Sequence, residues 1–90
     1  MFIWDEKKRE ANLVKHSLDF VDAAIVYDNP AKMTGISNRQ GEERYADIAL
    51  VEIAGSILTL VYVPRNTEIR IISFRKSSRR ERKRYEEQVR

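Results

Sequence analysis

The sequence has no cysteine and only one histidine, His16, among its 90 residues. The absence of thiols excludes a disulfide framework, a thiolate metal site and a cysteine nucleophile, and it suits a reducing compartment such as the cytoplasm. One imidazole and scattered carboxylates do not reproduce the ligand spacing of a transition-metal site. We therefore expect neither a metal nor a cofactor. A magnesium site made of carboxylates alone stays open, without a pattern that favours it.

Glycine and long apolar runs are also scarce. Gly35, Gly41 and Gly55 stand alone in turn-like surroundings, which excludes a glycine-rich phosphate loop and a nucleophile elbow. The first apolar stretch is too short for a signal peptide, and residues 57–63 fall far short of the ~20 residues of a membrane-spanning helix. We expect one soluble domain over residues 1–90, with no membrane association.

Basic residues are abundant but unevenly placed. Residues 75–90 hold eight Lys or Arg against three acids, a net of +5, so the other seventy-four residues together carry −2 of the total +3. Such asymmetry favours a polyanionic partner such as nucleic acid, although basic surfaces also bind acidic proteins.

Two helices are predicted near the N-terminus, after a short strand at residues 2–4. Asp5 has the position of an N-cap for a helix that begins near Glu6 and buries an apolar face. A second helix is predicted within residues 18–30, with Asp19 as its N-cap. The residues expected to face the core are Ala11, Val14 and Leu18 in the first helix, and Phe20, Ala23, Ala24 and Tyr27 in the second.

Strands follow from residue 31 onward. We predict an edge strand over 31–36, a polar loop over 35–41, and three long strands at 43–53, 57–63 and 68–74. Their short connections favour an antiparallel meander. Ser78 and Glu81 have capping-box spacing, so a last helix with Tyr85 and Val89 as its apolar stripe is expected. The fold class is α+β.

Arginine on these ordered elements is the strongest candidate for chemistry. Strand alternation puts Arg70 on the face of Ile72 and Phe74. A guanidinium there must be paired, for example with Glu52 or Glu43, or directed into a cleft, because it cannot lose its charge.

The other candidates each have two interpretations. Arg79 and Arg80, at the start of the last helix, form either a phosphate site or a solvated surface. His16 is either a general acid or base or a cap of helix carbonyls. The adjacent Glu43 and Arg44 are either a base with a charge clamp or a local ion pair, while Arg39 in the loop is an unspecific nucleic-acid contact.

Several stretches resemble the BrnT toxins of type II toxin–antitoxin systems. They are Phe2-x-Trp4-Asp5, Asn12-x-x-Lys15-His16, Glu43-Arg44, residues 69–75 with the pattern IRIIS-x-R, and Glu81-Arg82-x-x-Tyr85-Glu86. They span nearly the whole chain in the family's order. Ser17 stands where that family usually has glycine, so a left-handed helix end would cost roughly 1 kcal/mol more there.

This resemblance implies a RelE-like fold, with an antiparallel sheet, two helices before it and one after. It also implies a metal-independent ribonuclease that halts translation and is neutralised by a BrnA-like ribbon-helix-helix antitoxin, in a two-plus-two complex that binds operator DNA. On this basis Arg70, Arg44 and Arg75 are expected to clamp the scissile phosphate, with Glu43 or His16 moving protons. Flanking phosphates would contact Lys15, Arg39, Arg79 and Arg80. The rival is a non-catalytic module that holds an antitoxin or nucleic acid through the same basic surface.

Overall fold

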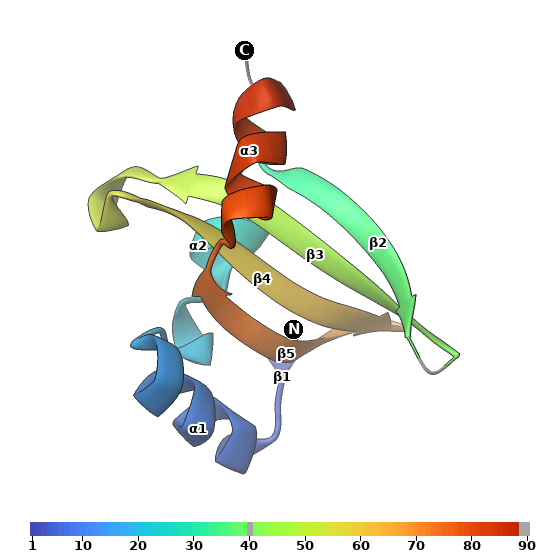
Figure 1. Ribbon diagram of the computed structural model, residues 1–90. Helices are drawn as coiled ribbons and strands as arrows, with labels where there is room; N and C mark the ends of the chain where they lie inside the picture. Colours follow the sequence, from blue (N-terminus) through green and yellow to red (C-terminus); the bar gives the residue numbers. More distant parts are fainter. Residues whose placement is uncertain (40, 89–90) are drawn as a thin grey trace.

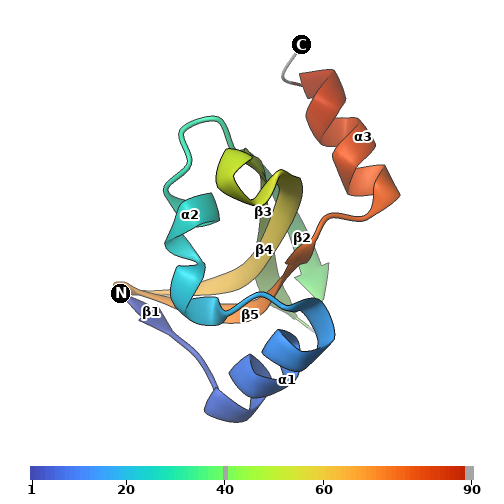
Figure 2. The ribbon, with the colours of Figure 1, turned by 90° about the vertical axis from the view of Figure 1, so that its left-hand side faces the viewer.

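The computed structural model describes residues 1–39 and 41–88, which form a five-stranded sheet with helices on both of its faces (Figures 1 and 2). The strand order is β1-β5-β4-β3-β2. The elements are β1 (Phe2–Ile3), α1 (Glu6–His16), the 3₁₀ turn η1 (Phe20–Asp22), α2 (Ala24–Tyr27), β2 (Met33–Arg39), β3 (Glu42–Val51), the 3₁₀ turn η2 (Glu52–Ala54), β4 (Ser56–Arg65), β5 (Glu68–Lys76) and α3 (Arg79–Gln88).

The sheet is mixed, so the prediction of an antiparallel meander is correct only in part. Strands β2 to β5 are joined by successive antiparallel hairpins. β1 instead pairs parallel with β5, because the chain returns to that edge only after all the other strands are laid down. The predicted polar loop over 35–41 is wrong: β2 continues through Arg39, and the hairpin turn is confined to the residues around Gly41.

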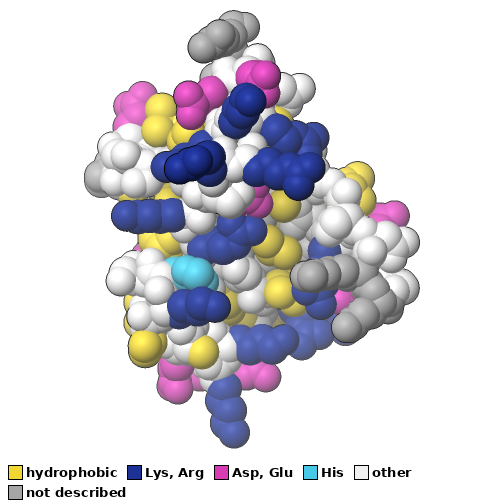
Figure 3. Space-filling view, in the orientation of Figure 1, with side chains coloured by type: hydrophobic (Ala, Val, Ile, Leu, Met, Phe, Trp, Pro, Cys, Tyr) yellow, Lys and Arg dark blue, Asp and Glu magenta, His cyan; other side chains and the backbone are white. Residues whose placement is uncertain are grey.

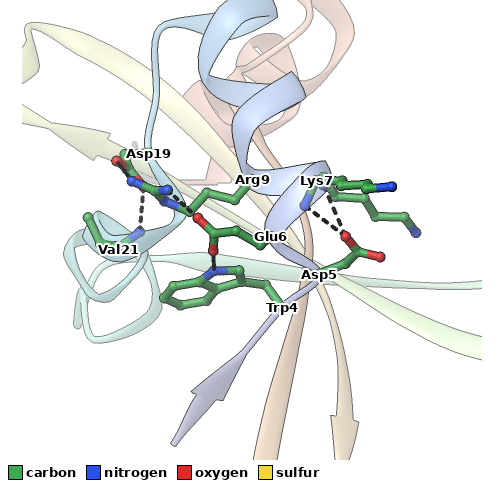
Figure 4. A network of polar contacts seen from close by, with 8 residues as sticks. Trp4, Asp5, Glu6, Lys7, Arg9, Asp19 and Val21 are labelled. Carbon is green, nitrogen blue, oxygen red and sulfur yellow. Dashed lines mark hydrogen bonds and ion pairs between the residues drawn. The ribbon is translucent and has the colours of Figure 1, made fainter.

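Helix α1 begins where its cap predicts. The Asp5 carboxylate accepts hydrogen bonds from the backbone N–H groups of Lys7 and Lys8, at 2.8 and 3.4 Å (Figure 4). Arg9 then reaches out of the helix to Asp19 with two hydrogen bonds of 2.8 and 2.9 Å. These bonds lower the pKa of Asp19 and raise that of Arg9, so the pair ties α1 to the start of η1.

The buried face of α1 is not the predicted one. Val14 is 87% exposed, whereas Asn12 is the buried residue of the helix. The Asn12 amide donates to the Phe74 carbonyl at 2.7 Å and accepts from the Phe74 N–H at 3.1 Å. Beyond the two residues paired with β1, no strand of the described chain borders the edge of β5, and the Asn12 side chain supplies hydrogen bonds there instead.

The predicted second helix is broken in two. Asp19 caps η1 through the Val21 N–H, and four-residue α2 follows. Phe20 and Ala23 are fully buried, as expected. The prediction for Ala24 is wrong, because the break rotates it outward and buries Val26 in its place.

The hydrophobic core lies on the face of the sheet that meets η1 and α2, here called the inner face. It is formed by Leu58, Leu60 and Tyr62 of β4 with residues of the neighbouring strands and Phe20. The Trp4 ring packs edge-to-face on Phe20 at 6.2 Å, so Trp4 is a core residue as expected. No helix of the described chain is long and apolar enough to cross a bilayer.

A buried carboxylate joins the inner face to the segment before β2. Asp47 is fully buried and accepts hydrogen bonds from Lys32 Nζ at 2.7 Å, Thr34 Oγ1 at 2.7 Å and Tyr62 OH at 3.1 Å. Lys32 also lies over the Tyr27 ring at 4.4 Å. Burial and the Asp47 charge raise the pKa of Tyr62, which keeps its hydroxyl protonated as a donor.

Candidate functional site

The side of the sheet opposite the core, here called the outer face, carries α3 (Figure 2). Most of the candidate arginines lie on this side. A β-bulge decides which side chains it displays. Val61 pairs with Ser73 and Tyr62 with Ile71, so Ile72 has no partner and the alternation of β5 shifts by one residue.

The bulge overturns the predicted orientation of Arg70. Ile71 and Phe74 both point into the core, although they are three residues apart. Arg70 pairs with Val63 and Arg75 with Thr59, two residues of β4 that face outward. A spacing of five residues, which would separate two side chains in a regular strand, therefore puts both arginines on the outer face.

Arg44 lies on the same face. Tyr45 pairs with Tyr62 across β3 and β4, so the preceding residue, Arg44, lies opposite Val63. Val63 in turn pairs with Arg70 on β5, which places the two arginines on either side of it. Arg44 and Arg70 are two strands apart, about 10 Å between backbones, a gap that two long side chains can close onto one phosphate.

These two guanidiniums are only weakly engaged within the chain. Arg44 Nε is buried without a hydrogen-bond partner and lies 3.6 Å from a Glu42 oxygen. Arg70 forms no ion pair with any residue in the described ranges, so neither Glu52 nor Glu43 neutralises it as the alternative interpretation expected.

Arg75 is held quite differently. Its guanidinium donates two hydrogen bonds to the Glu81 carboxylate, at 2.7 and 3.0 Å. The same carboxylate accepts from Thr59 Oγ1 at 3.2 Å and from the Ser78 N–H at 2.8 Å. Partial burial opposes ionisation, but these donors outweigh it and lower the pKa of Glu81 to about 2. Arg75 thus anchors α3 to the sheet.

The capping box of α3 is confirmed, and it changes the interpretation of Arg79 and Arg80. The Ser78 hydroxyl accepts from the Glu81 N–H at 3.2 Å while Glu81 reaches back to Ser78. A carboxylate of the protein itself therefore occupies the positive end of the helix. Arg79 and Arg80 are exposed beside it. Val89, the predicted partner of Tyr85, lies outside the described residues.

His16 ends α1 close to the arginines. Partial burial, followed by the charges of Lys15 and Arg75, lowers its pKa below the ordinary 6.5, so the imidazole is neutral at neutral pH. Figure 3 shows the histidine in cyan on a face where Lys and Arg side chains predominate and most acids lie at the margin. A neutral imidazole beside fixed cations can accept a proton.

Glu43 does not share this surface. Tyr45 stacks on core residue Tyr62, so alternation along β3 puts Glu43 on the inner side and Arg44 on the outer side. Glu43 is exposed and accepts a hydrogen bond from Tyr45 OH at 3.3 Å. Glu43 and Arg44 therefore lie on opposite sides of the sheet, because adjacent strand residues face opposite ways. Lys15 is exposed at the end of α1, and Arg39 ends β2.

Two residues of α3, Glu81 and Arg84, make contacts or line surfaces that the sequence did not predict. The sequence suggested Glu81 as part of a capping box and of the family pattern, and the structure shows that it also pairs with Arg75. Arg84 follows Arg80 by one helical turn on the same side of α3, a spacing that was available in the sequence. Among residues 1–39 and 41–88, no group of three or more His, Asp or Glu side chains is arranged to hold a metal ion.

Comparison with known proteins agrees with the sequence patterns. Residues 4–81 match the family described as "Ribonuclease toxin, BrnT, of type II toxin-antitoxin system". No curated protein sequence matches the chain.

Proposed function

Because the chain belongs to the BrnT family of ribonuclease toxins of type II toxin–antitoxin systems, we propose that its outer face cleaves RNA without a metal and so halts translation. In this reaction the 2′-oxygen of the RNA attacks the adjacent phosphorus, and the bond from phosphorus to the 5′-oxygen breaks. The products are a 2′,3′-cyclic phosphate and a 5′-hydroxyl. The 2′-hydroxyl loses a proton and the leaving oxygen gains one.

The observation that carries this proposal is the weakly engaged guanidiniums of Arg44 and Arg70. Both lie on the outer face. Arg44 contacts only a Glu42 oxygen 3.6 Å from its Nε, and Arg70 forms no ion pair with any described residue. Negative charge grows on the phosphate in the transition state, and fixed guanidiniums stabilise that charge without having to reorganise. Arg75 contributes chiefly by holding α3; its charge adds to burial and to the Lys15 charge, which together lower the pKa of His16.

His16 is the candidate for proton transfer, since Glu43 faces away from the arginine pair. Its lowered pKa keeps the basic form populated at neutral pH. Lys15, Arg79 and Arg80 are exposed around the site and suit contacts with flanking phosphates, and we assign Arg39 to the same role from its sequence position.

Membership of this family implies an antitoxin partner. We assign a BrnA-like antitoxin whose ribbon-helix-helix region binds operator DNA, in a complex of two toxins with two antitoxins. This assignment follows from the family resemblance.

Cleavage of a defined RNA by the purified protein in excess chelator tests the mechanism. We expect undiminished cleavage and a 2′,3′-cyclic phosphate end, and no cleavage where the nucleotide 5′ to the scissile bond carries 2′-deoxyribose. Loss of activity in chelator would exclude the metal-free reaction. An inactive protein that still binds its antitoxin would favour the non-catalytic module.

A further inference from the structure

A groove separates α3 from the β2 side of the outer face. Its volume is about 820 Å³, within the range of pockets that enclose a drug-sized ligand, so it has room for several side chains of a partner. The floor is apolar and formed by Met33, Ala46, Ile48 and Val61. Three of these side chains are partly exposed, and only Ile48 is buried.

The wall formed by α3 is basic. Arg80 and Arg84 both line the groove, are exposed, and form no ion pair with another residue of the described chain. They are four residues apart, so they lie one above the other on one side of the helix. Arg44 lines the groove from β3.

From this combination we propose that the groove is the docking site of the antitoxin, and that it receives an amphipathic helix with an apolar side and an acidic side. The apolar side covers the floor, and carboxylates one turn apart meet Arg80 and Arg84. The docked helix lies against Arg44, one of the two residues proposed to clamp the phosphate. Inhibition by this route therefore rests on the proposed function.

The composition of the groove favours a protein segment over RNA. Single-stranded nucleic acid binds to basic grooves that also offer aromatic rings for base stacking. The aromatic residue that lines the groove, Tyr45, stacks its ring on Tyr62 at 5.7 Å, so one face of the ring is already covered.

Gly35 supplies a way to fill the groove without disturbing the fold. A Cβ at this position would meet no heavy atom within 4 Å, and the backbone is outside the left-handed region. Gly35 pairs with Ala46 and lines the groove, whereas Asn38 pairs with Glu43 and points to the other face. Gly35→Phe should raise the Kd for the antitoxin by about 100-fold, and Asn38→Phe, the matched control, by less than about threefold.

Charge reversal on α3 tests the acidic side of the partner. Arg84→Glu should raise the Kd by about tenfold or more, with a smaller ratio at high salt. Lys83→Glu makes the same charge change one position away, outside the groove, and should leave the Kd within about threefold. Because Arg84 is exposed, this pair stays informative even if Gly35→Phe fails to fold.

The experiment measures calorimetric Kd values for the polypeptide encoded beside the toxin gene, together with RNA cleavage in its presence and absence. The proposal is supported if the Gly35→Phe and Arg84→Glu proteins cleave RNA normally and are no longer inhibited by the antitoxin. Unchanged Kd values in both variants overturn the docking site while leaving the proposed ribonuclease intact. Lost cleavage with unchanged antitoxin binding would mean that the groove holds RNA. If the parent cleaves no RNA, the proposed function fails, and the Kd comparison still decides the docking site.

Discussion

The two faces of the sheet differ in how their polar groups are satisfied. On the inner face every donor of the buried Asp47 network has its acceptor within the chain, and apolar side chains fill the remaining space. On the outer face Arg75 is paired in the same complete way, but Arg44 and Arg70 are not. The contrast supports the proposal that the outer face binds an external ligand through these charges.

The largest expected effect concerns the inner face. Phe74 is fully buried, so Phe74→Ala should lower the free energy of unfolding by about 3–5 kcal/mol through lost burial and a cavity. Val61→Ala removes a partly exposed side chain from the opposite face and should cost about 1 kcal/mol. Urea titration measures both, and equal losses would contradict the assignment of the core to one face.

The second prediction concerns the outer face, where a substitution should reduce activity and leave stability nearly unchanged. Arg70→Ala should slow RNA cleavage by about 10²–10³-fold, while changing the free energy of unfolding by less than about 0.5 kcal/mol, because Arg70 forms no ion pair with a described residue. Initial rates and urea titration give the two values. Arg82→Ala, which removes an exposed arginine of α3, is the control and should retain full activity. Unchanged cleavage in Arg70→Ala would remove that residue from the site.

His16 offers a third test through pH. As the pH falls, the imidazole is protonated and can no longer accept a proton, so cleavage should decline with a midpoint below 6.5. His16→Asn should lose about 100-fold in rate at neutral pH together with this dependence. Lys15→Gln removes a charge that lowers the His16 pKa, and the midpoint should therefore move to higher pH. If the cleavage rate of His16→Asn still declines at low pH, the decline belongs to another titrating group.

The smallest effect is expected at the anchor of α3. The pKa of Glu81 is about 2 in the folded chain and 4.5 ordinarily, so its stabilising contribution is complete above about pH 4.5 and is lost as the pH falls toward 2. Glu81→Gln should cost about 1–3 kcal/mol near neutral pH, since Arg75 loses a charged partner. Unfolding measured against pH should show the parent and variant converging over that window. Glu87→Gln, at an exposed position of the same helix, should track the parent throughout.

Local features of the sequence predicted the start of each main helix. Asp5 caps α1, and Ser78 with Glu81 caps α3, because these signals act between residues three or fewer positions apart. Ser17 ends α1 with a φ of 58°, a left-handed conformation adopted without the glycine that the family usually has there. The position of a helix end is therefore local information, even where the residue is not the preferred one.

Orientation was less predictable. The apolar spacing of Val14 suggested a core position, yet tertiary packing buried Asn12 because the open edge of β5 needed a hydrogen-bonding partner. Likewise a continuous helical pattern could not reveal the break between η1 and α2.

By itself the sequence determined the presence of the strands, the helix caps, the basic C-terminal segment and membership of the BrnT family. Only the tertiary structure decided that Arg70 shares a face with Arg44 and Arg75. The reason is physical: a one-residue bulge in β5 reverses the alternation on which any reading of a strand depends. Asn12, 62 residues away in the chain, binds the Phe74 backbone just after that bulge, and no local pattern encodes such a contact.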